Sequence, residues 1–208
     1  MNVPVSPVSY VSVFHYGLQS MANAGAEPVK QLLKLIDPLA TDALGGALAA
    51  ALLDNVDAIG AAGFQLDLSG DLGAGKTAIV RALLRGMGVS GAVKSPTFAL
   101  LEPYTVSSLD FYHFDFYRLK GAAEFDSAGF RDWFGPGRIC AVEWPERAGA
   151  RLAKADISVE LTVAGEGRLA ALHTSSELGE RCLNHAVANL QMLDDGLSLP
   201  APAHSSSR

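Results

Sequence analysis

The segment Gly70-Asp71-Leu72-Gly73-Ala74-Gly75-Lys76-Thr77 decides the fold class of this 208-residue chain. It satisfies the pattern G-x-x-x-x-G-K-[ST] at every fixed position. In that pattern the glycines let the loop wrap closely, so that successive backbone N–H groups point at phosphate oxygens. The lysine reaches the β- and γ-phosphates of a nucleotide, and the final hydroxyl ligates magnesium. The segment therefore predicts a phosphate-binding loop (P-loop) that binds ATP with Mg²⁺.

The sequence on either side of this loop supplies the strand and the helix that the pattern requires. Residues 64–68 are a short apolar run, which we expect to be a strand leading into a turn at Ser69-Gly70. Residues 77–87 carry apolar side chains at helical spacing, and the positive end of such a helix faces the same phosphates. A chance match is the alternative, because the chain has 21 glycines, but it would not explain the flanking strand and helix.

Hydrophobic periodicity and turn residues predict the other elements. Residues 139–142 are a fully apolar run, which fits a central strand buried on both faces. The remaining expected elements are a helix over 42–53 with Thr41 as N-cap, a hairpin of strands 98–101 and 109–116 separated by Pro103 and Ser107-Ser108, a helix over 122–134 broken near Gly129, a hairpin of strands 157–163 and 169–173, and a helix over 176–192 with Ser175 or Ser176 as N-cap.

The chain is expected to hold one domain with loosely ordered ends. Residues 1–36 carry no clear period and contain several prolines, so we predict a poorly ordered extension with a short helix at 29–36. The P-loop ATPase domain is expected to span residues 37–193. The tail, residues 194–208, is predicted to be disordered.

The charge balance bears on the class of partner. The chain has 22 acids and 16 bases, a formal net charge of −6, and no local run of Lys or Arg. Such a chain lacks the broad positive field that independent nucleic-acid binding usually needs. If the protein serves RNA chemistry, we expect a partner to hold the RNA.

Two further observations concern cysteines and membranes. Cys140 and Cys182 lie in apolar or helical patterns and are interpreted as buried thiols rather than as a disulfide or metal site.

The chain has no uninterrupted apolar stretch of the roughly 18 residues that a membrane span needs. Its first ten residues lack the pattern of a secretory signal. We expect a cytoplasmic protein with no membrane partner.

Glu143 directly follows the apolar run 139–142 and is the candidate second carboxylate for magnesium. In α/β proteins ligands bind beyond the carboxyl ends of the strands, and this residue is expected at that edge. A Glu stands here where Asp is commoner. An ordinary surface acid at a strand end is the alternative interpretation.

Asp115 is the other candidate carboxylate. It lies in the segment His113-Phe114-Asp115-Phe116-Tyr117-Arg118, where aromatic residues are interleaved with charged ones. The alternatives are a solvated strand face, a surface pair between Asp115 and Arg118, or a platform for stacking bases, and the negative net charge disfavours the last of these. His113 is interpreted as a structural rather than a catalytic histidine.

Several segments together resemble one family, the bacterial TsaE family (formerly YjeE), small ATPases required for threonylcarbamoyladenosine modification of tRNA. The resemblance covers residues from about 39 to about 190. The P-loop carries it together with four further segments: Lys94-Ser95-Pro96-Thr97-Phe98, Glu102-Pro103-Tyr104, His113 to Leu119, and Val142-Glu143-Trp144-Pro145-Glu146. The motifs SPTF and EWPE at these spacings are not general features of P-loop proteins.

The resemblance implies an α/β fold: a small, three-layer, P-loop NTPase-like fold whose mainly parallel sheet carries added antiparallel strands. It implies ATP and Mg²⁺ as ligands and TsaD and TsaB as partner subunits. Transfer RNA would be met only indirectly, through the complex. In that family the ATPase does not transfer the threonylcarbamoyl group but hydrolyses ATP and resets the complex for further turnover.

Residue roles carry over from the same resemblance. The loop from Gly70 to Lys76 would contact the phosphates, and Thr77 and Glu143 would contact magnesium. The segment Ser95-Pro96-Thr97 matches one switch-like region, and Asp115 a second one near the γ-phosphate. Catalytic roles are thus expected for Lys76, Asp115 and Glu143. Two further residues are implied beside the nucleotide, Thr41 and, on its other side, Arg168.

Three other functions are alternatives for a chain with this loop. A GTPase is disfavoured because the chain contains no N-K-x-D guanine motif. A small-molecule or nucleotide kinase generally needs an acceptor pocket and a lid with several arginines, whereas the arginines here are scattered. The third alternative is a scaffold that binds ATP but hardly turns it over.

Overall fold

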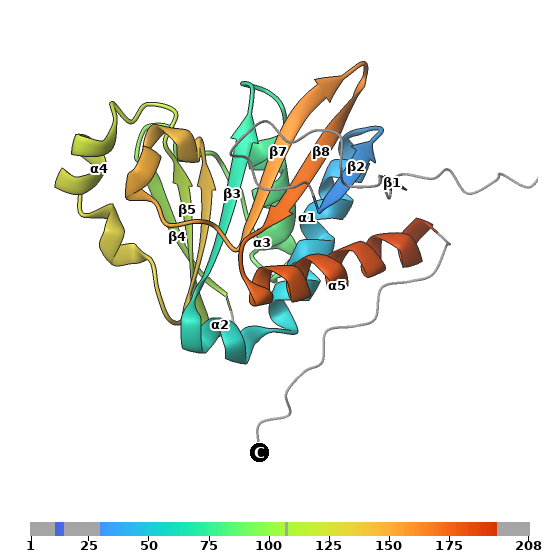
Figure 1. The fold of residues 1–208 in the computed structure, drawn as a ribbon, viewed down its shortest axis with the longest axis horizontal. Helices are drawn as coiled ribbons and strands as arrows, with labels where there is room; N and C mark the ends of the chain where they lie inside the picture. The colour runs from blue at the N-terminus through green and yellow to red at the C-terminus, as the bar shows by residue number, and fades with distance from the viewer. Residues whose placement is uncertain (1–10, 15–29, 107, 195–208) are drawn as a thin grey trace, which may run out of the picture.

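An eight-stranded sheet runs through the part of the chain that the computed structural model describes, residues 11–14, 30–106 and 108–194 (Figure 1). The strand order is β1-β2-β8-β7-β3-β6-β5-β4. The strands are β1 (Val11–Phe14), β2 (Gln31–Leu35), β3 (Phe64–Gly70), β4 (Leu101–Val106), β5 (Leu109–Asp115), β6 (Arg138–Glu143), β7 (Ile157–Ala164) and β8 (Gly167–Thr174).

The sheet is mixed. Three of its pairings are parallel, β5 with β6, β6 with β3, and β3 with β7. The other four, β1 with β2, β2 with β8, β7 with β8, and β4 with β5, are antiparallel. The expected antiparallel additions are confirmed, but the expectation of a mainly parallel sheet is wrong for the described strands. Antiparallel strands flank a short parallel centre on both sides. The antiparallel pairings therefore outnumber the parallel ones.

Helices cover the two faces of the sheet unequally. The main core lies on the face packed by α1 (Pro38–Leu53), α3 (Lys76–Gly86) and α5 (Glu177–Asp194), and the contacts of α1 with α3 and with α5 tie these helices together. A second, aromatic core on the opposite face of β5 and β6 packs beneath α4 (Ala122–Ser127) and the short 3-10 helix η1 (Phe130–Trp133). Figure 1 shows α4 at the β4–β5 end of the sheet, far from α5. The expected third layer is thus confined to that end.

The strand, loop and helix around residues 64–87 are confirmed. Alternate side chains of β3 point into the main core, where Leu66 and Leu68 are buried. Helix α3 begins at Lys76, within the P-loop pattern, and buries Ile79, Val80 and Leu83. β3 lies between β6 and β7, so the loop after it opens at the carboxyl end of the parallel centre.

Helix α1 begins earlier than predicted. Its N-cap is Asp37, whose carboxylate accepts a hydrogen bond from the Ala40 N–H at 2.8 Å, and Pro38 occupies the first helical position. Both features are typical helix starts. The prediction of Thr41 as N-cap is therefore wrong: Thr41 lies in the first turn, and its hydroxyl donates to the Asp37 carbonyl. A short helix that was not predicted, α2 (Val56–Ala62), follows α1.

The hairpin before the second core is shifted relative to the prediction. Its first strand is β4, Leu101–Val106, whereas residues 97–99 form a turn. Pro103, which was expected to separate the strands, lies inside β4 opposite Tyr112. Proline has no backbone N–H to donate to a neighbouring strand. It is tolerated there because β4 is an edge strand, with a neighbouring strand on one side only.

The expected short helix over residues 29–36 is also wrong. Gln31–Leu35 form strand β2, which pairs with β8 so that Leu33 lies opposite Ala170. Leu33 and Leu35 are buried while Lys34 between them is exposed, which is the period of a strand. Strand β1 also lies within the segment predicted to be a poorly ordered extension, and residues 1–10 and 15–29 lie outside the described part.

The remaining elements agree with their predictions. β7 and β8 form the hairpin around Gly165, and α4 and η1 are separated at Gly129. Helix α5 begins after Ser176, whose hydroxyl accepts a hydrogen bond from the Gly179 N–H at 2.9 Å. Of the predicted tail, residues 194–208, Asp194 ends α5 and residues 195–208 lie outside the described part.

No single helix in the described segments is long and apolar enough to cross a membrane. Helices α1 and α2 together meet the criteria of length and composition, but they are bent by 77° relative to each other. Most of α1 is buried against α3 and α5.

Candidate functional site

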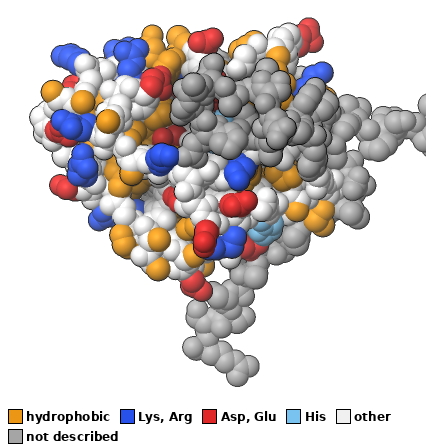
Figure 2. All heavy atoms as spheres, in the orientation of Figure 1, with side chains coloured by type: hydrophobic (Ala, Val, Ile, Leu, Met, Phe, Trp, Pro, Cys, Tyr) orange, Lys and Arg blue, Asp and Glu red, His pale blue; other side chains and the backbone are white. Residues whose placement is uncertain are grey.

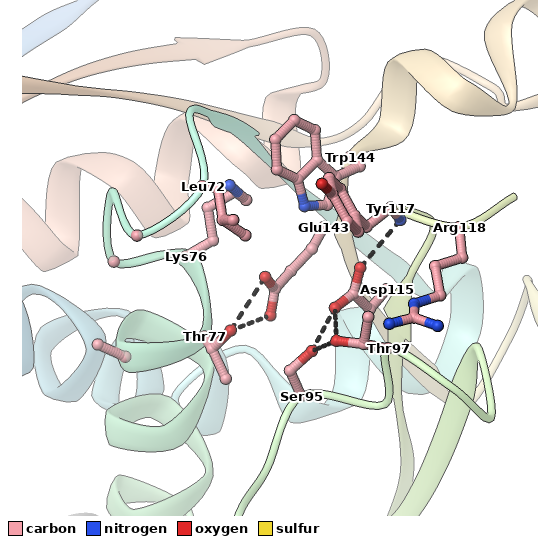
Figure 3. Close-up of a pocket in the computed structure, with 13 residues that line it drawn as sticks. Leu72, Lys76, Thr77, Ser95, Thr97, Asp115, Tyr117, Arg118, Glu143 and Trp144 are labelled. Atoms are coloured by element: carbon pink, nitrogen blue, oxygen red, sulfur yellow. Dashed lines mark hydrogen bonds between the residues drawn. The ribbon is translucent and has the colours of Figure 1, made fainter.

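A cavity of about 440 Å³ opens where the loop after β3, the start of α3 and the ends of β5 and β6 meet (Figure 3). Several of the predicted site residues line it, together with side chains from the segments around Ser95 and Tyr117. The lining residues are Leu72, Gly73, Gly75, Lys76, Thr77, Ala78, Ser95, Thr97, Asp115, Tyr117, Arg118, Glu143 and Trp144.

The loop needs glycine at its two ends. Gly70 has a φ of 124°, and a Cβ there would lie 2.2 Å from the Leu161 carbonyl oxygen on β7. Gly75, which caps α3, has a φ of 111°. Residues with a side chain rarely adopt such backbone angles, so glycine is required for the tight turn that joins β3 to α3. The turn leaves the N–H groups at the start of α3 free to meet an anion in the cavity.

Lys76 lies in the wall of the cavity and is almost fully buried. Its Nζ donates to the carbonyl oxygens of Gly70 at 2.6 Å and Asp71 at 2.9 Å. The same ammonium lies 3.9 Å from the centre of the Trp144 ring, a cation–π contact. Burial lowers the pKa of Lys76, and the carboxylates of Glu143 and Asp115 oppose that effect. The ammonium is therefore held at the loop by weak acceptors that a phosphate can replace.

Thr77 and Glu143 meet across the cavity. The Thr77 hydroxyl, at the start of α3, lies 2.8 Å and 3.0 Å from the two carboxylate oxygens of Glu143, at the end of β6. Both groups are hard oxygen ligands of the type that Mg²⁺ prefers. No group of three His, Cys, Asp or Glu residues able to hold a metal occurs in the described segments. This sparse set fits magnesium, which is usually bound by one or two protein oxygens together with phosphates and water.

His113 is the second partner of Glu143. Its Nε2 lies 2.8 Å from Glu143 Oε1, and its side chain is completely buried. His113 and Asp115 project from the same face of β5, because alternate residues of a strand share a face. In the parallel pairing of β5 with β6, Asp115 lies directly opposite Glu143.

Asp115 is occupied by three donors. The hydroxyls of Ser95 and Thr97 both donate to its Oδ2, the latter at 2.8 Å, and the Tyr117 N–H donates to its Oδ1 at 3.0 Å. Figure 3 shows these groups converging on Asp115 beside the cavity. The carboxylate thereby joins the segment before β4 to the end of β5.

An aromatic pair closes one side of the cavity. Trp144 has a φ of 60°, an unusual value for a bulky residue, and its backbone N–H donates to the Leu68 carbonyl of β3 at 3.1 Å. The Trp144 ring lies over Lys76 and packs on Tyr117 with the ring centres 5.0 Å apart. Strained backbone of this kind often occurs at ligand sites.

Arg118 lies at the rim of the cavity, beside an exposed aromatic side chain. Its guanidinium stacks on Phe98, with its central carbon 4.0 Å from the ring centre. The surface pair of Arg118 with Asp115, one of the alternative interpretations of this segment, is not among the ion pairs of the described residues.

Thr41 and Arg168 lie at the loop but do not line the cavity. The Arg168 Nε donates to the Ala74 carbonyl at 2.7 Å, and a Cβ on Gly75 would lie 3.2 Å from that nitrogen and 3.7 Å from Thr41 Cγ2. Both side chains thus flank Gly75 on its outer side. They support the loop from α1 and β8, two elements remote from it in sequence.

The two cysteines are buried, as predicted, and are not disulfide-bonded. Burial raises the pKa of each thiol to about 12. Neither is a reactive thiolate under neutral conditions.

The sequence interpretation missed two contacts of this site: the His113–Glu143 hydrogen bond and the Trp144 ring over Lys76. For the first, strand alternation indicates that His113 shares the face of Asp115, two residues away. Its contact with Glu143 also depends on the register between β5 and β6. The second depends on the unusual backbone of Trp144, which no local pattern indicates.

Comparisons with known proteins agree on one family. The model of the family "Threonylcarbamoyl adenosine biosynthesis protein TsaE" matches residues 36–170. The TsaE protein of Haemophilus influenzae is 41% identical over 117 residues, which cover 56% of this chain and 74% of that protein. The TsaE protein of Bacillus subtilis is 34% identical over 104 residues, covering 50% of this chain and 65% of that protein.

A solved structure supports the same relationship. The crystal structure of Bacillus subtilis YdiB superposes with a TM-score of 0.58 at 25% sequence identity, covering 76% of this chain and 93% of that one. The family match includes the loop, the Asp115 segment and Glu143, which together surround the cavity. This chain belongs to the TsaE family, whose members serve threonylcarbamoyladenosine biosynthesis in tRNA.

Proposed function

We propose that this protein is a Mg²⁺-dependent ATPase that acts with TsaD and TsaB in threonylcarbamoyladenosine modification of tRNA. The observation that carries the proposal is the meeting of three groups at one cavity. A glycine-bounded loop, the buried ammonium of Lys76 and the Thr77–Glu143 pair all face it. Backbone N–H groups, a lysine and a magnesium site are the parts that P-loop ATPases use.

The role of Lys76 follows from its present contacts. Within the described part of the chain its ammonium contacts two backbone carbonyls and an aromatic ring, so the negative oxygens of a β- or γ-phosphate would be stronger acceptors. The loop N–H groups between residues 71 and 77 would bind the remaining phosphate oxygens. Thr41 and Arg168 flank Gly75, and the Arg168 side chain bonds to the loop. Their proposed place beside the nucleotide rests on the resemblance to the TsaE family.

Thr77 and Glu143 would hold the metal. Magnesium bound with ATP neutralises charge that develops on the transferred phosphoryl group. Glu143 lies at the end of β6, so its carboxylate is presented by a buried strand rather than by a loop. Asp115, on the neighbouring strand, is the candidate for orienting the attacking water, and its links to Ser95 and Thr97 couple that role to the preceding segment.

The proposal that TsaD and TsaB hold the RNA rests on charge. The chain carries a net charge of −6. On the face shown in Figure 2, Lys and Arg side chains of the described residues are interspersed with Asp and Glu side chains. A mixed surface of this kind lacks the continuous positive field that favours RNA binding by the protein alone.

The deciding experiment is ATP binding by calorimetry with and without Mg²⁺, followed by co-purification with TsaD and TsaB and an assay of phosphate release. We expect Mg²⁺-dependent binding, a stable complex, and hydrolysis within that complex. Binding without hydrolysis in the complete complex would instead identify an ATP-dependent scaffold. Phosphate transfer to a small acceptor would identify a kinase.

A further inference from the structure

Glu143 is held between two elements by two donors. The Thr77 hydroxyl contacts it from helix α3, and the His113 ring contacts it from strand β5. Oε1 is the oxygen that both donors share, with each donor atom 2.8 Å away. The position of this carboxylate therefore depends on the sheet as well as on the P-loop helix.

The chemistry of the His113 contact defines the histidine tautomer. A carboxylate oxygen only accepts hydrogen bonds, so the ring proton must lie on Nε2. The other ring nitrogen, Nδ1, is buried and has no hydrogen-bond partner among the described residues. A neutral ring with its proton on Nε2 satisfies Glu143 and leaves no buried N–H group without an acceptor.

The neighbouring carboxylate explains why such a donor is needed. Asp115 lies directly opposite Glu143 in the parallel pairing of β5 and β6, and like charges in this arrangement repel. Asp115 takes its donors from Ser95, Thr97 and the Tyr117 N–H. Glu143 takes none of these, so His113 and Thr77 provide its separate set of donors.

We infer that His113 is a positioning residue: its Nε2–H group fixes the Glu143 carboxylate against Thr77 and thereby sets the Mg²⁺ affinity of the site. The inference rests on the proposed function. His113 does not line the cavity, so it would act through Glu143, the residue that would hold the metal. Loss of an outer hydrogen-bond partner of a metal ligand typically costs about 10–100-fold in metal affinity or activity.

The test compares two substitutions at this position. His113→Leu removes the donor but keeps an apolar side chain in the buried site, whereas His113→Gln keeps an amide N–H that can reach Glu143. The measurement is the Mg²⁺ concentration needed for half-maximal ATP binding, together with binding in EDTA and the thermal unfolding midpoint. We expect His113→Leu to raise that concentration at least about tenfold, with little change in EDTA, and His113→Gln to restore it to within about threefold of wild type.

Three outcomes would overturn the inference: unchanged Mg²⁺ dependence in His113→Leu, equal losses in both variants, or a loss in EDTA as large as that in Mg²⁺. Each of these would leave the proposed function standing if wild-type protein binds Mg²⁺-ATP. If wild-type protein does not bind it, the proposed function fails and the inference fails with it.

A second measurement observes the His113 ring in the wild-type protein. Nitrogen-15 NMR of ligand-free wild type should show His113 with its proton on Nε2 and with slow exchange of that proton, because the ring is fully buried. The signal can be assigned by its absence from His113→Gln. A proton on Nδ1 would place a bare nitrogen against the carboxylate and would overturn the inference.

Discussion

The Thr77 hydroxyl at the start of α3 lies 2.8 Å from the Glu143 carboxylate at the end of β6, although the two residues are 66 positions apart in sequence. The contact joins the P-loop helix to the strand beside β3. Both groups carry hard oxygen atoms of the type that Mg²⁺ prefers. The fold thus brings a hydroxyl from a helix and a carboxylate from a strand to one point of the cavity.

Lys76→Ala is expected to weaken ATP binding about ten- to hundredfold. The substitution removes an ammonium that would otherwise bond to phosphate oxygens, and a charge-assisted hydrogen bond contributes about 1.5–3 kcal/mol. Calorimetric titration with ATP and Mg²⁺ measures the change. Lys34→Ala, at an exposed position on β2, is the matched control and should bind like wild type. Unchanged affinity in Lys76→Ala would contradict the assignment of the loop as the phosphate site.

The two carboxylates should separate binding from chemistry. Glu143→Ala removes a candidate metal ligand, so Mg²⁺-dependent ATP binding should weaken at least about tenfold and hydrolysis should disappear. Asp115→Asn keeps a side-chain oxygen that Ser95 and Thr97 can reach, so binding should stay within about threefold while hydrolysis is lost. Calorimetry and a phosphate-release assay on both variants test this. The opposite pattern would mean that the two roles are exchanged.

The raised pKa of Asp67 leads us to expect that the stability of the fold depends on pH. Asp67 is partly buried on β3, where burial raises its pKa from 3.8 to about 7, against a hydrogen bond from Gln65. The folded protein thus binds a proton more tightly than the unfolded chain between these values, and this group makes stability fall as pH rises through that window. Asp67→Asn should therefore raise the free energy of unfolding by at least about 1 kcal/mol at pH 8.

The stabilisation by Asp67→Asn should shrink toward pH 4, where Asp67 is protonated in the folded protein. Urea unfolding at several pH values follows it, with the exposed Asp57→Asn on α2 as control. A gain that stays constant across pH would show that the pKa of Asp67 is the same in the folded and the unfolded protein.

Most parts of the fold that local sequence decides were predicted, and the exception is the start of α1, where Asp37 and Pro38 give a local signal that the prediction of Thr41 as N-cap missed. The P-loop, its strand and its helix follow from residues within 25 positions of one another. The apolar run before Glu143 correctly predicted β6, and turn glycines correctly predicted the hairpin of β7 and β8. In each case the pattern needs no knowledge of distant neighbours.

The errors at β2 and β4 and the missed contact of His113 arose where distant pairing decides the structure. Residues 31–35 have no strong local preference, but pairing with β8, more than 130 positions away, makes them a strand. Pro103 is compatible with β4 only because that strand is at the sheet edge. In the site, the contact of His113 with Glu143 depends on the register between β5 and β6, which the sequence does not reveal.

The isolated protein is expected to be a slow ATPase that TsaD and TsaB accelerate. One arginine, Arg118, lines the cavity in the described part of the chain. Its guanidinium is stacked on the exposed Phe98 ring. Charge developing on the transferred phosphoryl group is then poorly neutralised. A cation supplied or released by a partner can contribute about 10³–10⁵ in rate.

Steady-state phosphate release distinguishes the source of that cation. Activity is measured for the protein alone, with TsaD and TsaB, and then with tRNA added; we expect strong stimulation by the two subunits and little effect of tRNA alone. If docking frees Arg118 from Phe98, Arg118→Ala should lose most of the stimulation while Arg85→Ala, on the exposed side of α3, keeps it. Full stimulation in Arg118→Ala would assign the cation to a partner. A protein that turns over many times per second alone, and that the partners leave unchanged, would rule out partner completion.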